Sequence, residues 1–177
     1  MFVLAHLLFE LIKIGILSFI YTTICLLICE LVLKFKNGIS GFIRSKFWLI
    51  YKVIYGLLFV FSFTYYGDHG LGDESFIPLG HWETMRLSDT FAYFNPNGKS
   101  DQIAVNTFQV KDNILCASVD SGYMVYNLKN KEMRNFKTDM LYNIYASKHN
   151  LPRNGQFYDF FSHYKDYWMG WRFWVLP

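Results

Sequence analysis

The stretch that decides the fold is Ile14–Leu33, IGILSFIYTTICLLICELVL, in which Glu30 is the only charged residue. As a helix, these 20 residues would rise about 30 Å, which matches the hydrocarbon core of a bilayer. No basic segment precedes this run and no small-residue cleavage site follows it, so we do not expect a cleaved signal peptide. The sequence therefore predicts a retained transmembrane helix at about residues 11–33.

A second apolar run of 20 residues is Phe47–Tyr66, FWLIYKVIYGLLFVFSFTYY, with Lys52 as its only charge. Aromatic residues stand at both of its ends, as in the interfacial belts of membrane proteins. The two runs together predict a transmembrane hairpin of two helices, with the lipid bilayer as an obligatory partner.

The loop that would join the two helices, Lys34–Lys46, carries four basic residues and no acidic one. By the positive-inside rule, a short loop with this bias lies in the cytoplasm. We therefore expect a multi-pass inner-membrane protein whose C-terminal part, beyond about residue 67, is periplasmic or otherwise extracytoplasmic.

Composition and charge agree with a membrane location. The 177 residues are 53% hydrophobic and 18% charged, whereas soluble domains average about a quarter charged residues. The net charge of +3 arises in residues 1–66, which hold six basic and two acidic side chains, while residues 67–177 hold 11 basic and 12 acidic ones. The basic excess thus belongs to the membrane part, and no nucleic-acid partner is expected.

Glu30 and Lys52 are the charges inside the two predicted helices. In an antiparallel hairpin they would lie at similar depth and could pair, which would suit an accessory subunit of a transporter or motor. The alternatives are that Lys52 reaches the cytoplasmic interface and that Glu30 pairs with Lys34 one helical turn away.

Beyond the hairpin, residues 67–80 are rich in glycine and predict an irregular exit linker. Residues 81–177 predict a small α+β domain, because short runs of β-forming residues alternate with turn residues before a helix that begins after Thr138. The predicted strands are residues 81–87, 90–94, 103–110, 114–119, 123–128 and 132–136. Their succession favours an antiparallel sheet.

The C-terminal stretch Phe157–Pro177 contains ten aromatic residues among 21. Several of them recur at helical spacing, with Gly170 expected to break the helix. Such a stripe could form domain core, lie at the membrane interface or contact a partner protein. The candidate interaction residues are Phe161, Tyr164, Trp168, Trp171 and Trp174.

Candidate chemistry is confined to the exit segment and one cysteine. Carboxylates and imidazoles, which suit a divalent metal, are concentrated in this segment and the start of the next, at Asp68, His69, Asp73, Glu74, His81 and Glu83. Their spacing matches no metal motif, so we expect a solvated acidic loop and no bound metal. The lone Cys116 of the outer domain is most simply a buried strand thiol.

These patterns contain no catalytic or cofactor motif, and they favour a non-catalytic function. We expect a membrane-anchored protein-interaction module, either an accessory subunit of an envelope complex or a membrane-resident immunity protein. The alternatives are a metal-dependent enzyme or sensor that uses the Asp68–Glu83 cluster, and a transport or motor subunit that uses Glu30 and Lys52.

Overall fold

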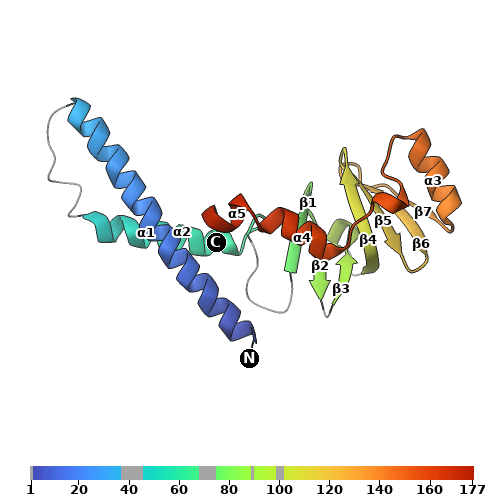
Figure 1. The fold of residues 1–177 in the computed structure, drawn as a ribbon, viewed down its shortest axis with the longest axis horizontal. Helices are drawn as coiled ribbons and strands as arrows, with labels where there is room; N and C mark the ends of the chain where they lie inside the picture. Colours follow the sequence, from blue (N-terminus) through green and yellow to red (C-terminus); the bar gives the residue numbers. More distant parts are fainter. Residues whose placement is uncertain (1, 37–45, 68–74, 89, 99–101) are drawn as a thin grey trace. The chain divides into compact units, whose positions relative to one another are not determined.

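A computed structural model describes residues 2–36, 46–67, 75–88, 90–98 and 102–177 of the protein (Figure 1). The protein forms two compact units. The helical unit comprises Met1–Gly72 together with Trp171–Pro177, and the sheet domain comprises Asp73–Gly170. The sheet domain is thus an insertion between two segments of the helical unit.

The first helix, α1, runs without a break over Phe2–Lys36. It is longer than the predicted 11–33 because the apolar residues before Lys13 continue the same helix, and no proline interrupts it. Its segment Leu7–Phe35 is long and apolar enough to cross a membrane, and it is the one such helix among the described residues.

The second helix, α2, spans Phe47–Ser62 and is shorter than the predicted 47–66. Its 16 residues rise about 24 Å, which is less than the ~30 Å of a bilayer core. The prediction of a 20-residue second helix was therefore wrong at its C-terminal end.

Local hydrogen bonds explain the early end of α2. The Thr64 hydroxyl donates to Phe61 O at 2.8 Å, and the Thr64 N–H donates to the same carbonyl at 2.9 Å. These bonds replace the helical pattern with tight turns. Gly67 then folds back so closely that a Cβ there would lie 2.4 Å from Phe61 O, so only glycine fits.

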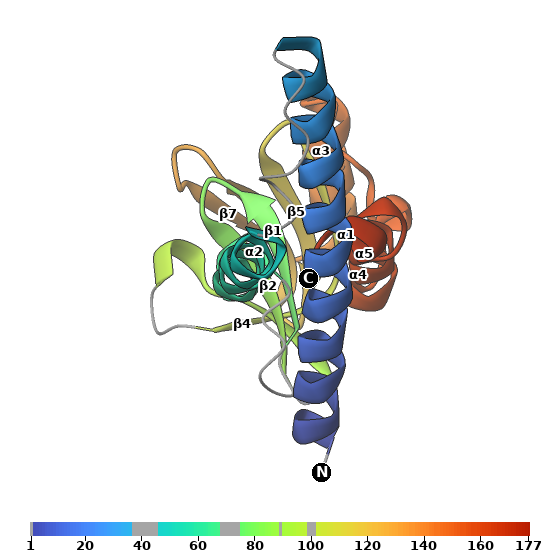
Figure 2. The same ribbon diagram turned by 90° about the vertical axis from the view of Figure 1, so that its left-hand side faces the viewer.

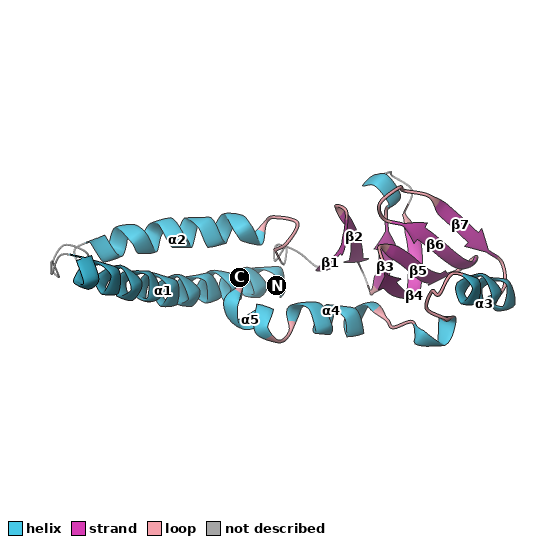
Figure 3. Ribbon diagram, turned by 90° about the horizontal axis from the view of Figure 1, so that it is seen from above, coloured by secondary structure: helices cyan, strands magenta, loops and turns pink. Residues whose placement is uncertain are grey.

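The sheet domain contains one antiparallel sheet of seven strands, which follow one another in sequence order from β1 to β7 (Figure 3). The predicted antiparallel sheet is confirmed. The strands are β1 Ser75–Gly80, β2 Glu83–Ser88, β3 Phe91–Phe94, β4 Ile103–Lys111, β5 Ile114–Val119, β6 Gly122–Asn127 and β7 Met133–Phe136.

The predicted exit linker 67–80 is wrong over its last six residues, which form β1. Glycine and proline made an irregular segment the expectation, but Pro78 is tolerated because β1 is an edge strand that pairs with β2 alone among the described strands. A two-residue turn at His81 and Trp82 joins the strands, with φ of 51° and 65°. These values are those of a type I′ turn, which usually has Asn, Asp or Gly at both positions.

Helices cover both faces of the sheet. Phe160 of α4 (Phe160–Trp168) joins a core that includes Phe94, Phe108 and Leu115. On the opposite face, α3 (Asp139–Lys148) buries Tyr142 and Ala146 against Cys116 and Val125. Because side chains of a strand alternate between faces, neighbours such as Leu115 and Cys116 enter different cores.

The remaining described elements are short. Two 3₁₀ turns lie at Pro96–Gly98 (η2) and Asn154–Gln156 (η3), and the last helix, α5, is Trp171–Val175. The predicted helix after Thr138 is confirmed as α3, with the Thr138 hydroxyl accepting the Leu141 N–H at its N-terminus.

Candidate functional site

The aromatic C-terminal segment divides at Gly170. Gly170 has a φ of 109°, a conformation that residues with a Cβ rarely adopt, and it separates α4 from α5. The expected helix break at this glycine is confirmed. The two halves belong to different units, since α4 lies in the sheet domain and α5 in the helical unit.

The aromatic residues of α4 mostly build the sheet domain. Trp168 is 6% exposed, and its indole N–H donates to Phe76 O at 2.9 Å. Tyr164 packs against the same core, whereas Phe161 is exposed. Trp168 and Tyr164 therefore pack against the sheet domain, and the buried indole of Trp168 offers no surface to a partner.

The aromatic residues of α5 differ, since Trp171 is 65% and Trp174 is 74% exposed. The same short helix is held against α1 by other groups. The Lys13 ammonium lies 4.8 Å from the centre of the Phe173 ring, and the Tyr21 hydroxyl donates to Val175 O. α5 thus lies along α1 between Lys13 and Tyr21 while its indoles face outward.

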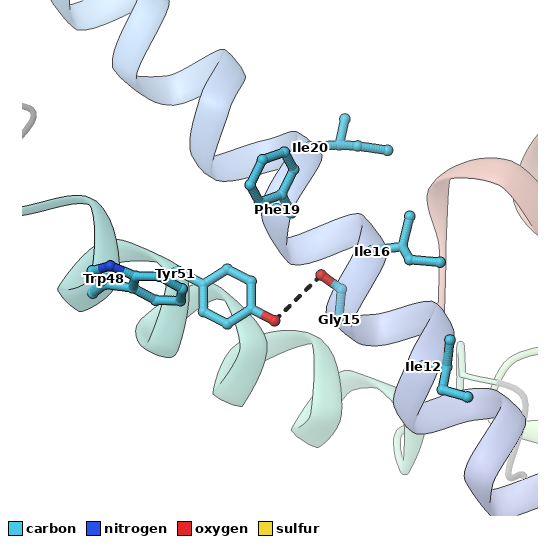
Figure 4. A pocket seen from close by; sticks show the side chains of 7 residues that line it. All are labelled: Ile12, Gly15, Ile16, Phe19, Ile20, Trp48 and Tyr51. Atoms are coloured by element: carbon cyan, nitrogen blue, oxygen red, sulfur yellow. Dashed lines mark hydrogen bonds between the residues drawn. The ribbon is translucent and has the colours of Figure 1, made fainter.

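The two long helices of the helical unit meet near the middle of α1. The rings of Phe19 and Phe47 are 5.6 Å apart, and the Tyr51 hydroxyl donates to Gly15 O at 3.4 Å (Figure 4). The helices cross instead of lying parallel, since α2 is seen end-on where α1 is seen along its length (Figure 2). A groove of about 380 Å³ lies between them, lined by Ile12, Gly15, Ile16, Phe19, Ile20, Trp48 and Tyr51.

This packing keeps Glu30 and Lys52 apart. Tyr51, the neighbour of Lys52, contacts Gly15, which precedes Glu30 by 15 residues, or about 22 Å along a helix. Both charged side chains are exposed, and neither forms an ion pair within the described residues. The predicted pairing of these two charges is not formed.

The acidic exit cluster is only partly visible, because Asp68, His69, Asp73 and Glu74 lie outside the described residues. The ring nitrogen Nε2 of His81 lies 3.2 Å from Asn113 Oδ1. Within the described residues, no group of three or more His, Cys, Asp or Glu side chains could hold a metal ion.

Glu83 instead belongs to a buried polar network that sequence reasoning missed. It is 5% exposed, and its Oε1 lies 2.6 Å from Lys131 Nζ and accepts the Tyr126 hydroxyl at 3.1 Å. Burial, and secondarily the nearby carboxylate, raise the pKa of Tyr126 to about 12. Lys131 is 48 residues from Glu83, so no local pattern could have paired them.

Cys116 lies fully buried on β5, as expected. Burial raises the pKa of its thiol, which opposes formation of the reactive thiolate. Its neighbour Tyr142 is also buried, and its hydroxyl donates to Pro152 O. These two residues act as core, and nothing in their described surroundings activates a nucleophile.

An exposed apolar face on α3 was also missed. Met140, Leu141 and Ile144 are all more than half exposed, whereas Tyr142 and Ala146 turn toward the sheet. The signal was present in the spacing of these residues, because i and i+4 share one helix face and the buried pair occupies the other.

No protein-family model, curated protein or solved structure matches this sequence.

Proposed function

We propose that the protein is a membrane-anchored, non-catalytic interaction module, an accessory subunit of an envelope complex or a membrane-resident immunity protein. The observation that carries the proposal is the pair of exposed indoles, Trp171 and Trp174, on a helix packed against the apolar helix α1. The helical unit is the anchor in this proposal, and the sheet domain is its extracytoplasmic part.

The position of α5 along α1 supports a contact surface at the extracytoplasmic membrane–water boundary. Twenty residues of helix, about 30 Å, separate Lys34 from Ile14, so Lys13 falls at the boundary opposite the basic loop. α5 lies next to α1 from Lys13 inward to Tyr21. Tryptophan is enriched both at this boundary and in the centres of protein interfaces.

The same contacts support the proposed topology. α5 meets the N-terminal half of α1, whereas the basic loop 34–46 follows its C-terminal end. A cytoplasmic loop would thus leave the C-terminal segment on the extracytoplasmic side. Contacts between α1 and a helix at residues 171–175 also favour retention of α1 over its removal as a signal sequence.

In this proposal α2 is the second helix of the hairpin and would have to turn toward the direction of α1, which it crosses in the structure. Its length falls a few ångströms short of a bilayer core, a mismatch that local thinning of the bilayer accommodates at small cost.

The two alternatives, a metal-dependent enzyme or sensor and a transport or motor subunit, receive less support. Glu83 is bound in an internal ion pair, and Glu30 and Lys52 do not meet.

The proposal is tested with the double variant Trp171→Ala/Trp174→Ala in the full-length protein, with Trp82→Ala as the matched control. Trp82 is equally exposed but lies in the β1–β2 turn of the sheet domain. Truncation of an interface tryptophan costs about 2 kcal/mol or more of binding, so we expect the double variant to lose its co-purifying membrane proteins.

The control variant should retain those proteins, and the melting temperature of the double variant should stay within about 2 °C of wild type, because exposed side chains contribute little to stability. Unchanged co-purification by the double variant would contradict the proposal. A double variant that binds vesicles less well yet keeps every protein partner would assign the indoles to lipid.

A further inference from the structure

A pocket lies on the sheet domain, where the end of β4 meets the segment that follows α3. The two segments enclose a pocket of about 430 Å³, within the range of small-ligand sites. Gln109, Val110 and Lys111 line it from β4, and Leu151, Pro152 and Tyr158 line it from the other side. No Asp or Glu contributes to its wall among the described residues.

The wall at Val110 contains an open strand edge. β3 pairs with β4 only as far as Val105, and farther along this edge Phe108 exchanges two backbone hydrogen bonds with Tyr158, at 2.8 and 3.1 Å. Alternate residues of an antiparallel strand direct their N–H and C=O groups to the same edge. Those of Val110 therefore point the same way as those of Phe108, and no described residue pairs with them.

The opposite edge of β4 pairs continuously with β5 from Thr107 to Lys111, so the N–H and C=O of Val110 cannot be bonded on that side. β5 pairs with Gln109 and Lys111 across a two-residue turn at Asp112 and Asn113, whose φ values are 50° and 63°. In such a turn the residues that flank it, Lys111 and Ile114, bond to each other. Val110 is consequently left with its backbone donor and acceptor unpaired among the described residues, at the edge of β4 that lines the pocket.

Lys111 adds a positive charge beside this edge. Its ammonium donates to Asn150 O at 2.7 Å, which uses one of its three N–H donors. The enclosed Gln109 Oε1 has no hydrogen-bond partner among the described residues, so turning this amide toward a ligand would break no bond of that oxygen.

We propose that this pocket binds an extended peptide segment that carries a carboxylate. The peptide backbone would pair with the N–H and C=O of Val110, as in other cases of strand addition, and its carboxylate would accept from the Lys111 ammonium. The carboxylate belongs either to the free C-terminus of the peptide or to an acidic residue within it. The site rests on the proposed interaction function and names the chemistry of one partner.

The test measures fluorescence anisotropy of labelled peptides with the full-length protein in detergent. The first probe is a pentapeptide of alternating valine and threonine with a free C-terminus; the second is its C-terminal amide, and the third is an amide with a terminal glutamate. A fourth probe is the first peptide with its central backbone nitrogens methylated. The protein variants are Lys111→Met and, as control, Lys129→Met, an exposed lysine of the β6–β7 turn.

We expect saturable binding of the first or third probe. The neutral amide and the methylated peptide should bind at least tenfold more weakly. Lys111→Met should lose tenfold in affinity for the acidic probe, whereas Lys129→Met should not. Preference for the first or the third probe identifies the source of the carboxylate. Equal binding of all four probes, equal binding by wild type and Lys111→Met, or no saturable binding of either acidic probe would overturn the site.

The methylated probe tests wild-type protein, so the result does not depend on how the variants fold. Trp174→Ala should bind the acidic probe normally, because Trp174 lies in the helical unit. Peptide binding that survives in this variant, together with unchanged co-purification of membrane proteins, would leave the pocket standing while the aromatic surface of α5 fails.

Discussion

The two halves of the C-terminal segment, α4 and α5, have the same aromatic character but differ in how far their tryptophans are buried. α4 turns Trp168 into the sheet domain and binds its indole N–H to Phe76 O, whereas α5 keeps Trp171 and Trp174 exposed on the helical unit. What separates the halves is one glycine, since Gly170 ends the path of α4 with a positive φ. Aromatic density alone therefore does not tell core from surface.

The largest expected effect distinguishes the two kinds of tryptophan. Trp168→Ala removes a buried ring and leaves Phe76 O without its partner, so it should lower the free energy of unfolding by about 3–5 kcal/mol. Trp174→Ala should change it by no more than about 0.5 kcal/mol. Urea unfolding of the full-length protein in detergent, followed by circular dichroism, measures both, and similar losses in the two variants would erase the contrast between α4 and α5.

A smaller effect is expected at the joint between the halves. Gly170→Ala places a Cβ on a residue with a φ of 109° and should cost about 1–3 kcal/mol of unfolding free energy. Gly155→Ala is the matched control, because it lies in the η3 turn without a positive φ and a Cβ there meets no atom within 4 Å. If Gly170→Ala melts like this control, the break between α4 and α5 does not depend on glycine.

The smallest expected effect concerns the start of α4, where Asp159 Oδ1 accepts the Ser162 N–H at 2.9 Å. Asp159→Ala should cost about 1 kcal/mol, while Asp159→Asn should preserve the cap. Hydrogen bonds from Ser162 lower the pKa of Asp159. The stabilisation they give is present above the ordinary pKa of an aspartate and is lost as the pH falls through the lowered value.

The Asp159→Asn variant should therefore lose less stability than wild type between about pH 5 and pH 2, a range that spans an ordinary aspartate pKa. Thermal melts across that range measure the difference. Parallel pH profiles for the two proteins would show that this carboxylate does not contribute to the acid sensitivity of α4.

Much of the fold was predictable because it follows local patterns. Runs of β-forming residues at 103–110 and 114–119 match β4 and β5 to within one residue, and Thr138 begins α3 as a capping residue should. The errors lie where local signals compete. Pro78 argued against a strand at 75–80, although this segment forms the edge strand β1. The hydroxyls of Ser62 and Thr64 bond to backbone carbonyls and end a helix that hydropathy alone would extend to Tyr66.

The candidate site was less predictable, because it depends on contacts between distant residues. The pairing of Glu83 with Lys131 and the exchange between Phe108 and Tyr158 each join segments about 50 residues apart. Helical spacing placed Trp168 and Trp171 on one stripe, but it could not show that the stripe crosses from one unit to the other. The register of α1 against α2, which separates Glu30 from Lys52, likewise depends on tertiary packing.

The hydrogen bond from Trp168 to Phe76 O also has a mechanical meaning. It ties the last turn of α4 to β1, the strand by which the polypeptide enters the sheet domain. Tension applied through the two chain connections, before β1 and after α4, would act on both elements together at this point. β1 would then not be pulled from the sheet one hydrogen bond at a time. The entry and exit of the domain are thus joined at one point, and a force transmitted from the helical unit through both connections would have to break this contact before it separated β1 from β2.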